Sequence, residues 1–313
     1  MGTVLNPAQQ RVLEALRAGE RAGPADPHLG PRLRARLEEP LAELSRGLAE
    51  PVQVSKAALA QIHACEAHYR AEEATPFSWS LATARGTVAH KAIELSLHRR
   101  DRPAPLTLVD AALQRLADDP DHRIAGFLLG LDETDRAELR SRVNDVVAKF
   151  AELWPPLSPA WRPRTESATR AELCGGRIRL AGKIDLALGT PQGLGPGTVL
   201  VDLKTGTPHA GHLDDLRFSA LMETLRVGVA PFRLAGYYLD AGTMEVEDVD
   251  EDVLESALRR TLAGARKVVE LRLGLRTPSV TANARCRWCP ARPDCPDGQD
   301  WSRGSPTGGD EFG

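Results

Sequence analysis

Two carboxylates and a lysine on neighbouring predicted strands are the residues best placed for chemistry. The run VLVDLKTG carries Asp202 and Lys204, which share a face because residues two apart on a strand point the same way. Asp185 belongs to the preceding strand candidate, and a hairpin through the Gly- and Pro-rich segment 189–197 would bring it beside Asp202. Two carboxylates at one point repel unless a divalent cation lies between them. The pattern predicts a metal site, with the Leu203 carbonyl as a further ligand.

A cation held in this way suits phosphodiester hydrolysis. It acidifies a bound water and neutralises the charge that grows on the phosphate. Lys204 would orient the attacking water and stabilise the transition state. The competing interpretation is a structural Asp–Lys pair at the end of a strand, and for this short motif alone that interpretation is the better one.

A histidine and a glutamate upstream fit the same chemistry. In GTVAHKAIE, His90 and Glu94 are four residues apart and share a face of a predicted helix. His90 could supply a neutral imidazole to the metal, and Glu94 could hold that ring or a metal-bound water. On its own, such a pair is more often a solvated surface pair.

The five cysteines suggest ligands and not disulfides. Three of them, Cys286, Cys289 and Cys295, form a tight set that lacks one member of a four-ligand site. Four cysteines outside any other context would indicate zinc, and His63 and His68 leave a mixed zinc site open.

These residues must be positioned by a chain that changes character along its length. Residues 1–50 and 107–153 have helical patterns, the latter broken at Pro120, and further helices are predicted from Ser55 and over 86–98, 213–225 and 251–274. Residues 165–205 alternate as strands do, and 232–239 is a further strand candidate.

Composition limits the class of protein. The 313 residues are 42% hydrophobic and 27% charged, which is typical of a globular chain that buries a core. No apolar run is long enough for a membrane span, and the first residues lack the pattern of a signal peptide, so we expect a cytoplasmic protein. The net charge of −3 means that any nucleic-acid contact must come from a local patch.

Taken together, GxxxHxxIE, GKIDLAL and VDLKTG resemble, in this order, the PD-(D/E)XK nuclease superfamily in its RecB-like branch. Similar modules occur in AddAB helicase-nucleases and CRISPR adaptation nucleases. The resemblance implies an α/β restriction-endonuclease-like core, with a mixed central sheet flanked by helices. It also implies a site made of His90, Asp185, Asp202 and Lys204 with Glu94 as helper, binding Mg²⁺ or Mn²⁺. The expected activity is cleavage of DNA ends or single strands, with exonuclease favoured over endonuclease action, in repair, recombination or defence.

The resemblance also extends to the cysteines. Similar nucleases bind a [4Fe–4S] cluster through one cysteine before the domain and three after it, which here are Cys65, Cys286, Cys289 and Cys295. Zinc is the alternative metal. Cys174 is expected to be a small buried hydrophobic residue and no ligand. The cluster would act as a clip that closes a very long loop.

The implied organisation has three parts. A helical extension covers 1–54, and the nuclease domain covers 55–300, with a helical insertion at 107–153 and the cysteine clip at 286–295. The remainder, 301–313, is expected to be a disordered tail.

One family motif departs from its usual form. The family usually carries QLxxY after the lysine, whereas this chain has Asp215, Leu216, Arg217, Phe218 and Ser219. Arg217 could contact phosphate instead, or be a plain surface arginine. The departure leaves two alternatives open: a degenerate nuclease fold that binds DNA or a partner protein without cutting, and a zinc-clipped nucleic-acid adaptor. No GxxxxGK[ST] motif is present, so unwinding would need a separate helicase.

Overall fold

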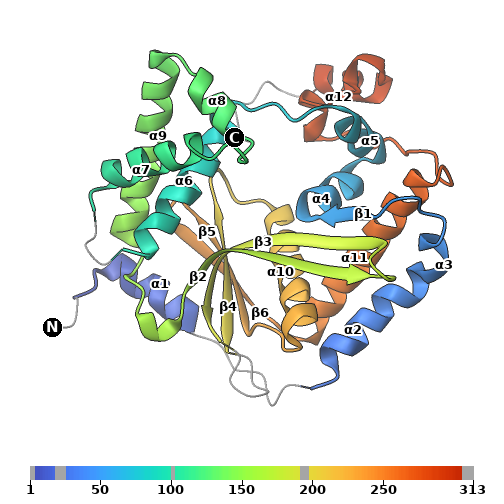
Figure 1. Ribbon diagram of the computed structural model, residues 1–313, viewed down its shortest axis with the longest axis horizontal. Coiled ribbons are helices and arrows are strands. Elements are labelled where there is room, and N and C mark those ends of the chain that lie inside the picture. The colour runs from blue at the N-terminus through green and yellow to red at the C-terminus, as the bar shows by residue number, and fades with distance from the viewer. Residues whose placement is uncertain (1–3, 18–25, 100–102, 191–196, 305–313) are drawn as a thin grey trace.

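The computed structural model describes residues 4–17, 26–99, 103–190 and 197–304. Within them a mixed six-stranded sheet is covered by helices on both faces (Figure 1). The predicted α/β restriction-endonuclease-like architecture is thereby confirmed. The strands are β1 (Val52–Ser55), β2 (Arg164–Leu173), β3 (Ile178–Gly189), β4 (Thr198–Lys204), β5 (Arg233–Tyr238) and β6 (Thr243–Asp248).

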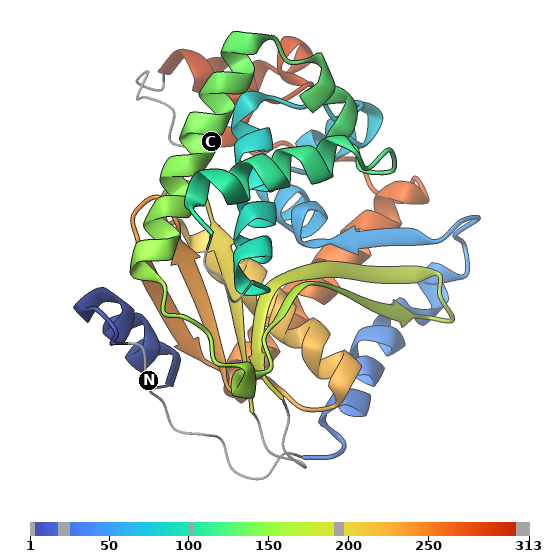
Figure 2. The ribbon, with the colours of Figure 1, turned by 60° about the vertical axis from the view of Figure 1, so that its left-hand side comes forward.

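The long strand β3 joins two parts of the sheet. Antiparallel β2 pairs along one of its edges. On the other edge, β1 pairs with 178–181 and β4 with 186–189, so 182–185 lie between these two partners. Parallel β5 and antiparallel β6 extend the sheet beyond β4. Figure 2 shows the two parts diverging along β3, and the candidate site lies at this divergence.

Two hydrophobic layers hold the helices on the sheet. One contains β1, α2, α4, α10 and α11, and the other contains α1, α6, α7 and α9. The helices are α1 (Pro7–Arg17), α2 (Leu29–Glu38), α3 (Ala42–Ser45), α4 (Lys56–Ala64), α5 (Glu66–Ala74), α6 (Leu81–Leu97), α7 (Pro105–Ala117), α8 (Ala125–Gly130), α9 (Glu133–Leu153), α10 (Ala210–Val227), α11 (Glu251–Arg272) and α12 (Pro296–Gly304). Short 3-10 turns lie at Glu39–Leu41, Pro159–Trp161, Ala284–Arg287 and Arg292–Asp294.

Local sequence explains where the helices that carry site residues begin. Ser55 caps α4 as expected, and its hydroxyl accepts the Ala58 N–H. Helix α6 begins five residues earlier than the predicted 86, because Ser80 and Thr83 form a reciprocal capping box. The predicted helical insertion consists of α7, α8 and α9. Strands β1 and β6 were not predicted.

The tail expected at 301–313 falls mostly outside the described residues. Residues 301–304 complete α12, and 305–313 are not described. In the described part of the chain, no helix combines the length and the apolar character needed to cross a membrane.

Candidate metal centre and cysteine site

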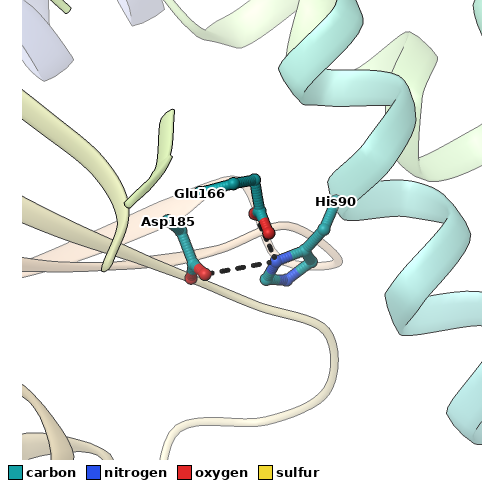
Figure 3. A group of neighbouring side chains, drawn as sticks. All are labelled: His90, Glu166 and Asp185. Carbon is teal, nitrogen blue, oxygen red and sulfur yellow. Dashed lines mark ion pairs between the residues drawn. The ribbon is translucent and has the colours of Figure 1, made fainter. Parts of the chain in front are cut away.

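Three side chains from three elements converge at the divergence of the sheet. His90 comes from α6, Glu166 from β2 and Asp185 from β3 (Figure 3). The His90 Nδ1 lies 3.4 Å from Asp185 Oδ1 and 3.7 Å from Glu166 Oε1. One ligand atom from each residue lies within 4.8 Å of the others, a spacing that one metal ion can span.

An irregularity in the β2–β3 ladder presents the two carboxylates. Thr165 pairs with Leu186 and Ser167 with Ile184, which places Glu166 opposite Asp185. Glu166 has a φ of 47°, a left-handed conformation that is rare for a residue other than glycine. The alternation of side chains between the two faces of β3 is also interrupted here. Ile184 and Leu186 are two residues apart, yet they pack into different hydrophobic layers. Such local backbone strain concentrates at functional sites.

The second predicted carboxylate is buried between two lysines. Asp202 is 4% exposed, its Oδ1 lies 2.9 Å from Lys56 Nζ, and its Oδ2 lies 2.8 Å from Lys204 Nζ. Lys204 Nζ is also 3.4 Å from Asp215 Oδ2. The Leu203 N–H donates to Asp185 Oδ2 at 2.8 Å and ties β4 to the His90 group. The two halves of the site are therefore connected through the backbone of β4.

Burial and neighbouring opposite charges shift the pKa values of the site residues in opposite directions. Burial disfavours the charged imidazole, but Asp185 and Glu166 outweigh it and raise the pKa of His90 to about 10. Burial likewise disfavours the carboxylates, but His90 lowers the pKa of Asp185, and His90 and Lys183 lower the pKa of Glu166. Asp202 and Asp185 raise the pKa of Lys56 against its burial. Each buried acid thus has a cationic partner.

The donor set fits a hard divalent cation. Imidazole and carboxylate oxygens are suitable ligands for Mn²⁺, and carboxylates for Mg²⁺. A metal would replace the His90 proton, because a ligating imidazole is neutral. Asp202 Oδ2 is buried, and the contact recorded for it among the described residues is the Lys204 ammonium, 2.8 Å away.

The structure brings together some of the predicted site residues but not all of them. It brings His90 together with Asp185, and Asp202 together with Lys204. Glu94 instead forms an ion pair with Lys91, 2.8 Å away, and lines the same cleft as His90. The predicted metal role of Glu94 and that of the Leu203 carbonyl stay predictions.

Two charged residues of the site were not predicted from the sequence. Glu166 has no motif around it, and only the strand pairing opposite Asp185 could have indicated it. Lys56 follows β1, a four-residue strand whose pairing with β3 carries this lysine to Asp202.

The His90 group lies in an open cleft. Helices α6 and α7, the segment before α6, and strands β2 and β3 line it. The cleft contains basic residues (Lys91, Arg115, Lys183), acidic residues (Glu94, Asp119) and the aromatic residues Phe77 and Trp79. Its open form leaves the candidate metal accessible to a chain-like substrate.

The four cysteines expected to form one site line a common cavity. Cys65 lies at the junction of α4 and α5, the other three lie in the C-terminal segment, and residues of α5 and α12 line the same cavity. Backbone N–H groups point at the sulfurs: Thr281 N lies 3.5 Å from Cys65 Sγ, and Asn283 N lies 3.4 Å from Cys286 Sγ.

The remaining two thiols have similar backbone contacts. The Gly298 N–H is 3.4 Å from Cys295 Sγ, and the Ala291 N–H is directed at Cys289. Such donors stabilise metal-bound thiolates. Cys174 lies elsewhere, where its sulfur is 3.7 Å from the Glu38 carbonyl oxygen, and it does not line the cavity.

The spacing of the four sulfurs bears on the group that they could bind. Among the described residues, three or more candidate ligand atoms gather within 4.8 Å only at His90, Glu166 and Asp185, so no three sulfurs do. A tetrahedral zinc ion, with Zn–S bonds of about 2.3 Å, needs its sulfurs about 3.8 Å apart. A four-iron cage binds each thiolate to a different iron and holds them farther apart. This spacing is compatible with the cluster.

Protein contacts already hold the cysteine segments together. The Glu66 carboxylate, 2% exposed, lies 3.0 Å from Lys267 Nζ and 2.9 Å from Arg276 Nε, and accepts the Ser279 N–H at 3.1 Å. Asn283 Nδ2 donates to the Ala64 carbonyl oxygen at 3.2 Å. These contacts bring the C-terminal segment against the residue next to Cys65.

Comparison with known proteins defines the class. A sequence model of the PD-(D/E)XK nuclease superfamily matches residues 53–296, and the chain therefore belongs to this superfamily. No curated protein matches it. A solved structure named "Putative exonuclease", from Eubacterium rectale, is 13% identical, with a TM-score of 0.47 and coverage of 75% of this chain and 87% of that one. A second, named SSO0001, is 15% identical, with a TM-score of 0.35 and coverage of 85% and 94%.

Proposed function

We propose that the protein is a metal-dependent deoxyribonuclease of the RecB-like branch, which acts on DNA ends or single strands. The observation that carries the proposal is the convergence of His90, Glu166 and Asp185 next to the Asp202–Lys204 pair, in an open cleft. Membership of the superfamily supplies the reaction class, and the site supplies the residues.

The geometry supports a role for each residue of the site. Asp185 and His90 would hold Mg²⁺ or Mn²⁺, together with Glu166 and Asp202. A bound divalent cation supplies an acidified water and neutralises phosphate charge. Lys204, anchored by Asp202 and Asp215, has its ammonium at the site and would position the attacking water.

Lys56 and Glu166 would act mainly by positioning. Lys56 holds Asp202 Oδ1 from the β1 side, which leaves Oδ2 and Lys204 toward the chemistry. Glu166 fixes the His90 ring through Nδ1 and is itself paired with Lys183. Residues that orient a metal ligand in this way typically change metal affinity about 10–100-fold when mutated.

The proposal includes a structural [4Fe–4S] cluster bound by Cys65, Cys286, Cys289 and Cys295. The shared cavity and the backbone N–H groups support it, and the sulfur spacing is compatible with it. The cluster would join segments more than 200 residues apart in the chain and limit the entropy of the unfolded state.

A non-cutting module that binds nucleic acid is the second candidate. One observation favours it: both oxygens of Asp202 face lysine ammonium groups, as in a site that is neutral without a metal. The retained Asp185, Asp202 and Lys204 favour the enzyme.

A cleavage assay separates the two candidates. Anaerobically purified protein is incubated with end-labelled single-stranded and double-stranded DNA and with circular single-stranded DNA, with Mn²⁺ or EDTA. We expect cleavage of linear DNA only with Mn²⁺, and resistance of the circle. Cleavage of the circle would establish endonuclease action, and binding without any cleavage would favour the module. Assays with a separate helicase would then test whether unwinding extends the substrate to duplex.

A further inference from the structure

Two aromatic rings lie at the rim of the cleft that contains the His90 group. Phe77 and Trp79 precede α6, and both line the cleft together with His90, Glu166 and Asp185. The Phe77 side chain is 60% exposed, an unusual position for a large apolar group that is costly to leave in water. Their ring centroids are 5.0 Å apart at 89°, an edge-to-face pair.

The aromatic pair is fixed to the fold through Trp79. The Trp79 indole N–H donates to the Arg123 carbonyl oxygen at 2.9 Å, and its ring lies 6.4 Å from the Phe127 ring. Trp79 also packs against the layer that contains α6 and α9. Phe77 is therefore presented on a rigid support, and little conformational freedom would be lost when a flat ligand stacks on it.

A cation on the same cleft has no partner among the described residues. Arg115 of α7 lines the cleft and makes no ion pair or hydrogen bond with any residue that the structure describes. Lys91 and Lys183 line the same cleft, but each already pairs with a glutamate. A flat apolar surface, a guanidinium without a partner among the described residues and a candidate metal group line one cleft, and together they match bases and phosphates of a nucleic-acid strand.

We propose that Phe77 and Trp79 form a stacking platform for the unpaired bases of single-stranded DNA. Arg115 then contacts the backbone while a neighbouring phosphate reaches the His90 group. This inference rests on the proposed nuclease function and specifies its substrate. Bases in a duplex are stacked on each other and cannot offer a free face to Phe77, so the platform selects single strands.

The test measures binding in EDTA, so that no strand is cut. Fluorescein-labelled oligothymidine and an equally long strand made only of abasic residues are titrated with the parent and with Phe77→Ala, Phe77→Trp and Leu129→Ala. Leu129 is the matched control, because it is 66% exposed and does not line the cleft. Fluorescence anisotropy gives Kd for each pair.

We expect Phe77→Ala to raise the Kd for oligothymidine at least about fivefold, the lower end for the loss of one base–aromatic stack. The Kd for the abasic strand should not change, Phe77→Trp should restore binding, and Leu129→Ala should have no effect. An equal loss for both strands, or no loss, would overturn the platform. If the parent cuts DNA while Phe77→Ala binds normally, only the platform fails; if the parent cuts no DNA, the proposed function fails instead.

Discussion

The candidate metal centre and the cysteine site are built on opposite principles. In the metal centre, buried acids are matched by cations from separate elements, as with Asp202 between Lys56 and Lys204. At the cysteine site the sulfurs meet backbone N–H groups, and the charged contacts lie one residue away at Glu66. In the metal centre, the paired charges therefore belong to the candidate reactive groups themselves. At the cysteine site, the paired charges belong to residues next to the sulfurs.

This difference predicts different sensitivities to mutation. Removing one charge from the metal centre leaves its partner buried and uncompensated, so chemistry and local electrostatics change together. Removing one sulfur from the cysteine site should disturb few protein contacts and act mainly through loss of the proposed cluster. The following variants test this contrast, from the largest expected effect to the smallest.

The Asp202→Asn variant should abolish cleavage. A neutral amide is a poor ligand for a hard cation, and it releases the Lys204 ammonium from its anchor. Metal catalysis is worth several kcal/mol, so we expect a rate loss of about a thousandfold or more. The measurement is single-turnover cleavage of end-labelled DNA in Mn²⁺, with circular dichroism to verify the fold.

Asp214→Asn is the control for that variant. Asp214 belongs to the same region but pairs with Arg260, 3.4 Å away, and is partly exposed. It should retain parental cleavage. If the Asp202→Asn enzyme cuts as fast as the parent, the metal assignment is wrong.

The Cys65→Ser variant should lose both colour and stability. Anaerobically purified parent should be brown, with about four irons per chain. The variant should be colourless, and its unfolding midpoint should fall because the link between the two segments is gone. Cys174→Ser should change neither property, since its sulfur lies outside the cavity.

One outcome would contradict the cluster, and another would contradict Cys65 as its ligand. Colourless parent protein that contains stoichiometric zinc would replace iron with zinc and leave the nuclease site intact. A brown Cys65→Ser protein of unchanged stability would show that the fourth ligand lies elsewhere.

His90→Ala and Glu166→Gln should raise the Mn²⁺ requirement by different amounts. His90 is a proposed ligand, whereas Glu166 both approaches the ion and orients the ring. We expect the Mn²⁺ concentration for half-maximal cleavage to rise about 10–100-fold in Glu166→Gln and at least as far in His90→Ala. Unchanged metal titrations would reduce these residues to a structural ion pair.

The sequence predicted much of the fold and most of the site, but not Glu166 or Lys56. Alternating apolar residues predicted β3 and β4, and the hairpin between them predicted that Asp185 and Asp202 would be neighbours. Glu166 could not be predicted from the sequence because its role depends on a left-handed backbone conformation and on the pairing register between β2 and β3. No local pattern encodes either property.

Short or exposed strands were not predicted for a related reason. Strand β1 has four residues, and β6 is largely exposed, so the apolar alternation in VQVS and TMEVED is too short to identify a strand. Missing β1 also concealed Lys56, which reaches Asp202 only because β1 runs parallel to β3. Residues that depend on pairing between distant segments are the ones that local periodicity cannot reveal.

The Glu66→Gln variant gives the smallest effect and separates protein contacts from the cluster. Burial alone would raise the pKa of Glu66, but Arg276, the Ser279 N–H and Lys267 lower it to about 2. The amide keeps the shape and one acceptor but loses the charge. Because Arg276 and Lys267 are about one-third exposed, we expect a loss of only about 1–3 kcal/mol in the free energy of unfolding.

Urea unfolding and the visible absorbance of the cluster should then respond separately. Glu66→Gln should lower the urea midpoint while the brown colour remains, whereas Cys65→Ser should change both. Glu72→Gln is the control, because Glu72 is 36% exposed and its contact with His68 is 3.9 Å. If Glu66→Gln loses the colour at unchanged stability, the charged contacts serve to assemble the cluster and not to hold the fold, and the contrast between the two sites would reverse.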